Sequence, residues 1–330
     1  MTVAVRSFAK INLGLYIGAR RPDGFHDLRT VYQTIALHDV IRVSLDVESK
    51  ARGNGIEILC DDPRVPLDSS NTCHRMAVLV MEALKRRDQL TIKIEKKLPV
   101  QGGLGAASSN AVAAMLGLER VLKKRLSGSE RLRIAAEVGS DLPLFLIGGT
   151  VLGVGRGEEV YPLPNLPSMP MVVVTPEVGV STPRAFADWD EAVVSQTELT
   201  HSGSSDRLFE VGCALSAWLN NYPDAGAPAK RGGRAGSLLS DLVRAGIEND
   251  FEKVVFPQFP ELRDMKRALV RAGSRYASLS GSGSTLYGLF RSAAEAEKAA
   301  GRLRKQGLRA TATRTLTRRQ YEKSSVVVRR

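Results

Sequence analysis

The sequence predicts a mixed α+β fold divided into two domains. Its 330 residues are more than the roughly 150 that a single domain usually holds. Strand-like and helix-like segments follow one another irregularly, which favours antiparallel neighbours over a regular strand–helix–strand series. Hydrophobic residues make up 43% of the chain and charged residues 25%, as in ordinary globular proteins, and this composition excludes wholesale disorder.

The first half of the chain predicts several strands followed by helices. Polar and apolar residues alternate from Val3 to Leu15, which is typical of a half-buried strand, and the sequence RRPDG at 20–24 predicts a turn. We expect further strands at 30–36, 39–46, 55–59 and 90–95. Capping residues predict helices after 68–71, near Ser108 and from Ser129 to about Gly139.

The second half predicts alternating strands and helices. Apolar runs at 145–152 and 169–175 predict strands, and the connector between them is rich in glycine and proline. We therefore expect one domain at 1–156 and another at 157–330. Beyond these strands the sequence predicts a surface loop at 221–236, helices at 238–249, 260–273 and 293–306, and strands at 276–280, 285–290 and 310–317.

The positive charge is concentrated near the carboxyl end of the sequence. The formal charge is +12, and residues 301–330 hold ten Lys and Arg against one acid, which leaves +3 for the first 300 residues. Such a segment is typical of a solvated face or a frayed terminus. The three cysteines are widely spaced, and the first ten residues do not resemble a secretion signal, so we expect a reducing, cytoplasmic location.

A glycine-rich segment between a strand and a helix is the strongest chemical signal. Residues 98–111 read LPVQGGLGAASSNA, so small residues lead into a helix whose first N–H groups are unpaired. This pattern suits a phosphate cradle, in which Ser108 and Ser109 offer hydroxyls to phosphate or metal, although a capped glycine turn has the same appearance. The pattern is neither a Walker loop nor a dinucleotide fingerprint.

Three other segments have a chemical and a structural interpretation. Residues 278–285, SLSGSGST, form either a second ligand loop or a hairpin turn. Asp141 in GSDLP at 139–143 is either a reactive carboxylate or a turn residue. Lys10 in AKIN at 9–12 is either a functional cation or a solvated charge at a strand edge.

Taken in order, these segments resemble the GHMP-superfamily kinases. The resemblance rests on FAKINLGL at 8–15, RPDGFHDL at 21–28, the loop at 99–109, GSDLP at 139–143 and LSGSGS at 279–284. The element RPDGFH resembles one branch of the superfamily, which phosphorylates the 2-hydroxyl of a cytidine diphosphate-linked methylerythritol in non-mevalonate isoprenoid synthesis. The chain departs from the usual pattern at Ala106 and Ala107, where glycine is common.

The resemblance implies a two-domain GHMP kinase fold with the active site in the cleft between the domains. The N-terminal, ATP-binding domain would resemble the second domain of ribosomal protein S5, and the α/β C-terminal domain would bind the substrate. The implied cofactors are ATP and Mg²⁺, with unknown metal ligands, and the implied state is a monomer or weak dimer that binds no membrane or nucleic acid.

The resemblance also implies a role for particular residues. Asp141 would be the general base, Lys10 would keep it ionised, and Asn12 would position the substrate hydroxyl. The substrate's cytosine would contact Phe25, His26 and Phe186, and its phosphates would contact Gly281, Ser282, Gly283 and Ser284. The nucleotide would lie over Asn71, Pro99, Gly102, Gly103, Leu104, Gly105, Ala106, Ala107, Ser108 and Ser109.

Two other functions remain open at this point. Another GHMP kinase, for homoserine or mevalonate, would keep ATP and Asp141 but would not use Phe25 and His26 to bind cytosine. A nucleic-acid-binding protein would account for the pI of about 9.8, although aromatic residues are only 5% of the chain and no basic stripe accompanies them.

Overall fold

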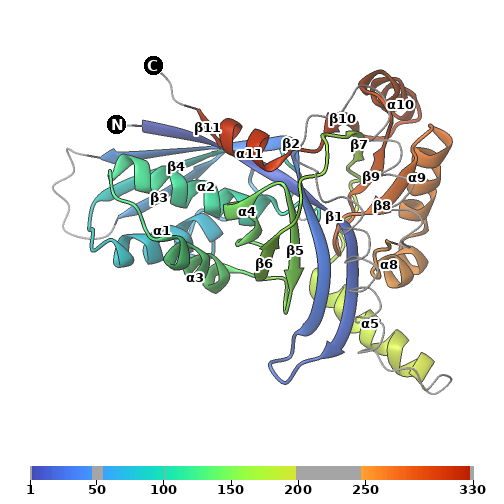
Figure 1. The fold of residues 1–330 in the computed structure, drawn as a ribbon, viewed down its shortest axis with the longest axis horizontal. Coiled ribbons are helices and arrows are strands. Elements are labelled where there is room, and N and C mark those ends of the chain that lie inside the picture. Colours follow the sequence, from blue (N-terminus) through green and yellow to red (C-terminus); the bar gives the residue numbers. More distant parts are fainter. Residues whose placement is uncertain (1, 47–54, 101, 198–246, 328–330) are drawn as a thin grey trace.

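The computed structural model describes residues 2–46, 55–100, 102–197 and 247–327 (Figure 1). They form two sheets with helices packed against each, which confirms the mixed α+β class. None of the helices in these ranges is long and apolar enough to cross a membrane. The predicted loop at 221–236 and most of the predicted helix at 238–249 lie outside the described residues, and Asn249 forms an isolated β-bridge.

The first sheet has seven strands and is built on one long hairpin. Its order is β11-β1-β2-β4-β3, and β2 also pairs with β5, which pairs with β6. All pairs are antiparallel except β3 with β4. The strands are β1 (Thr2–Arg20), β2 (His26–Asp46), β3 (Ile56–Cys60), β4 (Gln89–Glu95), β5 (Thr150–Val154), β6 (Glu159–Pro162) and β11 (Val326–Val327).

The expected break between strands at 30–36 and 39–46 is wrong, because β2 runs through both segments. The register of β1 against β2 shifts between Phe8 and Lys10, so the irregularity is taken up as a bulge rather than as a turn. The expected half-buried character of β1 is also wrong for most of its length. Its residues from Phe8 to Ile17 are all buried, since helices and the second sheet cover it.

Helices α1 (Thr72–Ala83), α2 (Ala106–Val121) and α3 (Gly128–Val138) pack with the first sheet around one hydrophobic core. Asn71 caps α1, as the sequence predicts. Ser127 rather than the expected Ser129 caps α3, because Ser127 and Glu130 form a reciprocal capping box.

The segment 145–152 is not the expected strand. Residues Leu144–Ile147 form the short helix α4, and β5 begins only at Thr150. Gly148 and Gly149 have φ of +68° and +71°, so the backbone reverses there and divides the apolar run. The following connector contains β6, so the first sheet extends past residue 157.

The second sheet has four antiparallel strands in the order β10-β7-β9-β8. These are β7 (Pro170–Val174), β8 (Tyr276–Leu279), β9 (Leu286–Leu289) and β10 (Ala310–Arg314), and the sequence predicts each within a few residues. Among the described residues, the helices at this end of the molecule are α5 (Thr182–Thr197), α8 (Glu252–Gln258), α9 (Pro260–Arg271) and α10 (Ala293–Lys305).

The basic segment at 301–330 is not a frayed terminus within its described part. It contains the end of α10, β10, α11 (Arg318–Ser325) and β11, which pairs with β1. Tyr321 of α11 is buried and its hydroxyl donates a hydrogen bond to the carbonyl of Phe145 over 2.6 Å. Most cations of this segment are exposed, as expected for a solvated face.

Strand β1 connects the cores of the two sheets. Val5 belongs to the core of the first sheet, Ile11 to a core shared with β7 and β9, and Leu15 to the core under α8 and α9. Figure 1 shows β1 and β2 as two long blue strands that run from the helices of the first sheet past those of the second. Residues along this hairpin can therefore face ligands held by both parts of the fold.

Candidate active site

A cleft of about 630 Å³ is lined by residues of β1, β2, α5 and both glycine-rich loops. It brings together most of the residues that the sequence singles out. They are Lys10, Asn12, Phe25, His26, Asn71, Pro99, Gly102, Gly103, Leu104, Gly105, Ala106, Ala107, Ser108, Asp141, Phe186, Gly281 and Ser282. Ser109, Gly283 and Ser284 lie behind this surface and do not line it.

Lys10 is a buried cation, not a solvated edge charge. Lys10 is 3% exposed. Its Nζ lies 3.3 Å from Oδ2 of Asp141 and 2.7 Å from Oδ1 of Asn12. The side chain of Asp141 is 35% exposed, so one partner of the pair is open to the cleft. A buried ammonium group needs such partners, because removal from water without them is costly.

Asn12 is held in one orientation by its neighbours. Its amide nitrogen donates to Oγ1 of Thr30, whose hydroxyl donates in turn to the carbonyl of Gly14. The amide oxygen is thereby directed at Lys10. The result is a continuous chain of hydrogen bonds and ion pairs from the β1 backbone to Asp141.

The first glycine-rich loop lies against Lys10. The backbone N–H of Lys10 donates to the carbonyl of Leu104 over 3.0 Å, and Gly105 precedes α2 with φ of +67°. A Cβ on Gly105 would lie 3.0 Å from Cγ of Lys10, so this position requires glycine both for its backbone angle and for space. The first N–H groups of α2 can therefore face the cleft as an anion cradle.

The two glycine-rich loops are packed backbone to backbone. A Cβ on Gly103 would lie 2.1 Å from the carbonyl oxygen of Ser280, and one on Gly283 would lie 2.4 Å from the Gly103 nitrogen. Asn249 holds the second loop, because its side-chain nitrogen donates to the carbonyls of Leu279 and Gly281. The segment at 278–285 is therefore both a hairpin connection and part of the cleft.

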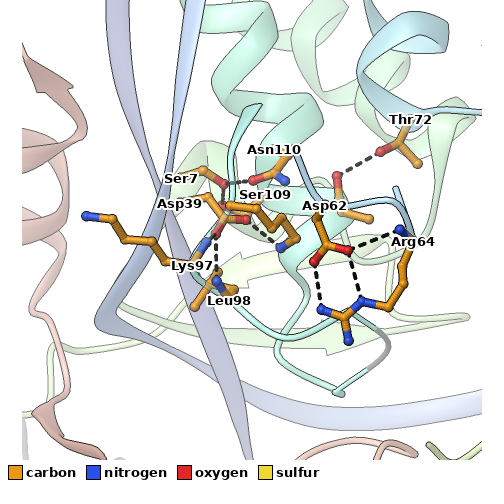
Figure 2. A network of polar contacts seen from close by, with 11 residues as sticks. Ser7, Asp39, Asp62, Arg64, Thr72, Lys97, Leu98, Ser109 and Asn110 are labelled. Carbon is orange, nitrogen blue, oxygen red and sulfur yellow. Dashed lines mark hydrogen bonds and ion pairs between the residues drawn. The ribbon is translucent and has the colours of Figure 1, made fainter. Parts of the chain in front are cut away.

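Figure 2 shows the polar contacts that attach the first glycine-rich loop and the beginning of α2 to the scaffold. The hydroxyls of Ser7 and Ser109 lie 2.7 Å apart, and Ser7 donates to Oδ1 of Asn110 over 2.6 Å. The single hydroxyl proton of Ser7 thus has two acceptors on α2, Oγ of Ser109 and Oδ1 of Asn110. Ser109 thus fastens α2 to β1.

Asp39 fixes the chain just before the first glycine-rich loop. Its carboxylate is fully buried and accepts the backbone N–H groups of Lys97 and Leu98, at 2.6 and 2.7 Å (Figure 2). It also pairs with Nζ of Lys96, which lines the cleft, over 2.7 Å. Three donors satisfy the buried charge and set the direction in which the loop begins.

Asn71 lines the cleft with a side chain whose two polar atoms are already bonded. Its oxygen accepts the N–H of Cys73, and its nitrogen donates to the carbonyl of Pro66 over 2.6 Å. Thr72 donates to the carbonyl of Ala107 and so joins the beginnings of α1 and α2. Asn71 therefore shapes the wall of the cleft as a helix cap.

An aromatic group lies where the β1–β2 hairpin turns. The rings of His26 and Phe186 stack on each other, 5.0 Å apart and 11° from parallel. Nε2 of His26 lies 2.6 Å from Oδ1 of Asp190, and Phe25 is 50% exposed beneath the guanidinium of Arg156. His26 and Phe186 touch directly, so a planar ligand would lie against this pair rather than between its members.

Sequence reasoning missed three residues that organise the site, namely Tyr32, Asp39 and Asp190, whereas the segment 249–252, which begins with Asn249, belongs to the resemblance. Tyr32 stands directly opposite Asn12 in the β1–β2 register. The register shifts of the hairpin decide which side chains share a face, and the turn predicted at 20–24 does not determine them. Asp190 is far from His26 in sequence and carries no local signal.

Two sequence profiles match the chain. The profile of the N-terminal domain of GHMP kinases matches residues 71–149, and that of the C-terminal domain matches residues 231–308. The first match contains the glycine-rich loop and Asp141. The fold and the cleft thus place the protein among the GHMP kinases.

The relatives narrow this class to one enzyme family. The 4-diphosphocytidyl-2-C-methyl-D-erythritol kinase of Solibacter usitatus (strain Ellin6076) is 38% identical over 288 residues, which are 87% of this chain and 81% of the relative. The kinase of the same name from Desulfitobacterium hafniense (strain Y51) is 33% identical over 96% of this chain and 97% of its own length. The chain belongs to the 4-diphosphocytidyl-2-C-methyl-D-erythritol kinase family.

The solved structures agree with this placement. A crystal structure of 4-(cytidine 5'-diphospho)-2C-methyl-D-erythritol kinase has a TM-score of 0.68 and 28% identity, and the match covers 94% of this chain and 98% of the other. Homoserine kinase from Cytophaga hutchinsonii (ATCC 33406) matches with the same TM-score over 96% and 95% of the two chains, but at 21% identity. The second likeness concerns the fold alone.

Proposed function

We propose that this protein transfers the γ-phosphoryl group of ATP to the 2-hydroxyl of 4-diphosphocytidyl-2-C-methyl-D-erythritol, in non-mevalonate isoprenoid precursor synthesis. The observation that carries the proposal is the Lys10–Asp141 pair, 3.3 Å apart, in a cleft that joins a helix N-terminus to a His–Phe stack. The names of the relatives support this choice of substrate.

In this reaction Asp141 accepts the proton of the attacking hydroxyl. Its carboxylate is partly exposed to the cleft, whereas Lys10 is buried against it. The ammonium group of Lys10 stabilises the carboxylate and the negative charge of the transferring phosphoryl group. Phosphoryl transfer depends mainly on positioning and charge stabilisation, so these groups suffice for the protein's part in the chemistry.

The nucleotide phosphates would lie over Gly102–Ser108, where α2 offers unpaired N–H groups. Among the described residues no group of three or more His, Cys, Asp and Glu side chains surrounds a metal position. The hydroxyl of Ser108 lines the cleft and suits a Mg²⁺ held mainly by ATP oxygens. Bound in this way, the ion would neutralise phosphate charge, and Ser108 is the one protein ligand that we assign.

The cytidine end would bind at Phe25, His26 and Phe186, and Gly281 and Ser282 would face the substrate phosphates. Gly283 and Ser284 support that loop from behind. Because His26 is already stacked on Phe186, we place cytosine against the edge of the pair and beside the exposed ring of Phe25. Binding energy from this remote base can orient the reacting hydroxyl.

Expectations about the domain boundary, location, oligomeric state and nucleic-acid binding belong to the same proposal. We place the domain boundary at 163–169, after β6, instead of at 156, since β6 pairs with β5 in the first sheet. Strand β11 returns to that sheet from the second domain. We also propose a cytoplasmic monomer or weak dimer that binds no nucleic acid.

A panel of acceptors tests the proposed function. Purified enzyme with ATP and Mg²⁺ is supplied in turn with the cytidylylated methylerythritol, the free sugar alcohol, homoserine and mevalonate. We expect transfer to the cytidylylated compound with the highest kcat/KM. Equal kcat/KM for the free sugar alcohol, or a preference for homoserine or mevalonate, contradicts the assigned substrate while leaving the kinase class intact.

A further inference from the structure

Tyr32 is a buried side chain of β2 that touches both charged groups of the site. Its hydroxyl donates a hydrogen bond to Oδ1 of Asp141 over 2.9 Å, and Nζ of Lys10 lies 5.5 Å from the centre of its ring. The residue is 2% exposed, and it lines the cleft. Tyr32 lies outside the segments on which the resemblance to the family rests.

We propose that Tyr32 is a positioning residue for the phosphoryl transfer, which holds the carboxylate of Asp141 in the orientation of a general base. The inference rests on the proposed function of Asp141. The hydroxyl occupies Oδ1, and Lys10 lies on the side of Oδ2. Because each carboxylate oxygen has a partner, the carboxylate is held in one orientation. Its exposed part faces the cleft, where the acceptor hydroxyl would bind.

Tyr32 is a donor at every working pH. Burial, followed by the charge of Asp141, raises the pKa of the Tyr32 hydroxyl well above its usual value near 10. The hydroxyl therefore keeps its proton over the working pH range and can donate it to Oδ1 of Asp141. The other charges near this contact are Lys10 from β1 and Glu158 from the β5–β6 turn, whose carboxylate is paired with Arg156.

The backbone at Gly157, in the turn between β5 and β6, lies close to the Tyr32 hydroxyl. Gly157 has φ of +101°, and a Cβ at this position would lie 2.5 Å from the Tyr32 hydroxyl oxygen and 3.9 Å from Oδ1 of Asp141. A side chain at 157 would force the tyrosine off Asp141. The absence of a side chain at Gly157 therefore leaves the space that the Tyr32–Asp141 hydrogen bond needs.

The test is Tyr32→Phe, which keeps the ring beneath Lys10 and removes only the donor. We expect kcat with the cytidylylated substrate to fall about ten- to a hundredfold, with the KM for ATP changed less than about twofold. We also expect the KM for the acceptor to change less than about twofold, because a misplaced general base slows the transfer more than it weakens binding. Tyr321→Phe is the matched control, since that buried hydroxyl donates to the carbonyl of Phe145.

Carboxyl carbon NMR of the free enzyme supplies a readout that does not depend on any acceptor. The signal of Asp141, assigned by its loss in Asp141→Asn, should have a different chemical shift at one fixed pH in Tyr32→Phe than in the wild type, because its Oδ1 loses a hydrogen-bond donor, and it should be unchanged in Tyr321→Phe. An unchanged kcat and an unchanged Asp141 signal in folded Tyr32→Phe would overturn the proposal. If the wild type prefers another acceptor, the proposed function fails, and the NMR comparison still decides the role of Tyr32.

Discussion

At the scale of single residues, the site depends on a lysine that the fold removes from water. Lys10 would be costly to bury alone, but Asp141 and Asn12 lie within 3.3 and 2.7 Å of its ammonium group. Its sequence position gives no sign of this, because a lysine in a strand is usually an exposed edge residue. The expected role of Lys10 beside Asp141 comes from the family resemblance of the surrounding motif at 8–15, not from the lysine alone.

Asp141→Asn should remove most of the phosphoryl transfer, by about a hundred- to ten-thousandfold in kcat, because an amide cannot accept the proton. The hydroxyl of Tyr32 would keep the amide oxygen on its side, so the NH₂ group would face Nζ of Lys10. We expect ATP affinity, measured by calorimetry, to change only a few-fold. Asp264→Asn, at an exposed pair with Arg267, is the control. Turnover near that of the wild type would contradict the general-base assignment.

His26→Ala should lower kcat/KM for the cytidylylated substrate about ten- to a hundredfold and leave the KM for ATP unchanged. The imidazole is 5% exposed and held by Asp190 and Phe186, so its edge is presented in one orientation. Asp190→Ala should produce a smaller loss in the same direction, since it frees the ring without removing it.

The control for this pair is His38→Ala, at a histidine that packs on Phe8 and bonds to the carbonyl of Ala36. Steady-state kinetics with varied acceptor and varied ATP separates the two substrates. If His26→Ala raises the KM for ATP as much as that for the acceptor, the assignment of the two ends of the cleft is wrong.

At the scale of elements, capping residues and glycine loops were predictable, whereas a short apolar run was not. Asn71 before α1 and the small residues before α2 satisfy helix ends locally, so their sequence signal is local as well. The run at 145–152 has no such signal, because a short buried helix and a buried strand share one composition. Tyr32 and Asp190 reach their partners through register and tertiary packing, which no local pattern encodes.

Gly105→Val should weaken ATP binding by at least about tenfold and lower kcat, while the protein stays folded. The position has φ of +67°, and a Cβ would meet Cγ of Lys10 and Cζ of Phe145, each at 3.0 Å. The strain falls on the cradle and on Lys10 together. Calorimetric ATP binding and thermal melting are measured on the same sample.

Gly128→Val is the matched control, because a Cβ at Gly128 meets nothing within 4 Å. We expect near-normal ATP affinity in this variant. A Gly105→Val protein that melts far earlier than the control, yet binds ATP normally in its folded fraction, would show that the loop is only a structural turn.

At the scale of the whole molecule, the basic segment at 301–330 contributes to stability in its described part. Three of its cations, Arg302, Arg304 and Lys305, lie in the last turn of α10, where they complement the helix dipole. Arg318 donates to the carbonyls of Thr150 and Leu163 and so joins α11 to β5 and the segment after β6. The concentration of positive charge leads to the expectation of a frayed terminus. That expectation is wrong for the described part, because a charge pattern carries no information about packing.

Tyr321→Ala should lower the free energy of unfolding by about 3–5 kcal/mol, the usual cost of deleting a buried aromatic side chain. Its ring packs 5.6 Å from that of Phe8, and its hydroxyl is bonded to Phe145. Urea unfolding checks the value, with the exposed Lys323→Ala expected to change it by less than about 0.5 kcal/mol. A Tyr321→Ala protein as stable as this control would mean that α11 is dispensable.

The pairing of β1 with β11 also has a consequence for synthesis of the protein. Ala4 lies opposite Val327 and Val5 opposite Val326, so this edge of β1 can pair only after the residues up to Val327 have left the ribosome. Until then β1 exposes an unpaired edge, a surface that promotes association between chains. During synthesis, the free edge of β1 is therefore the part of the first sheet at which unwanted pairing with other chains is expected.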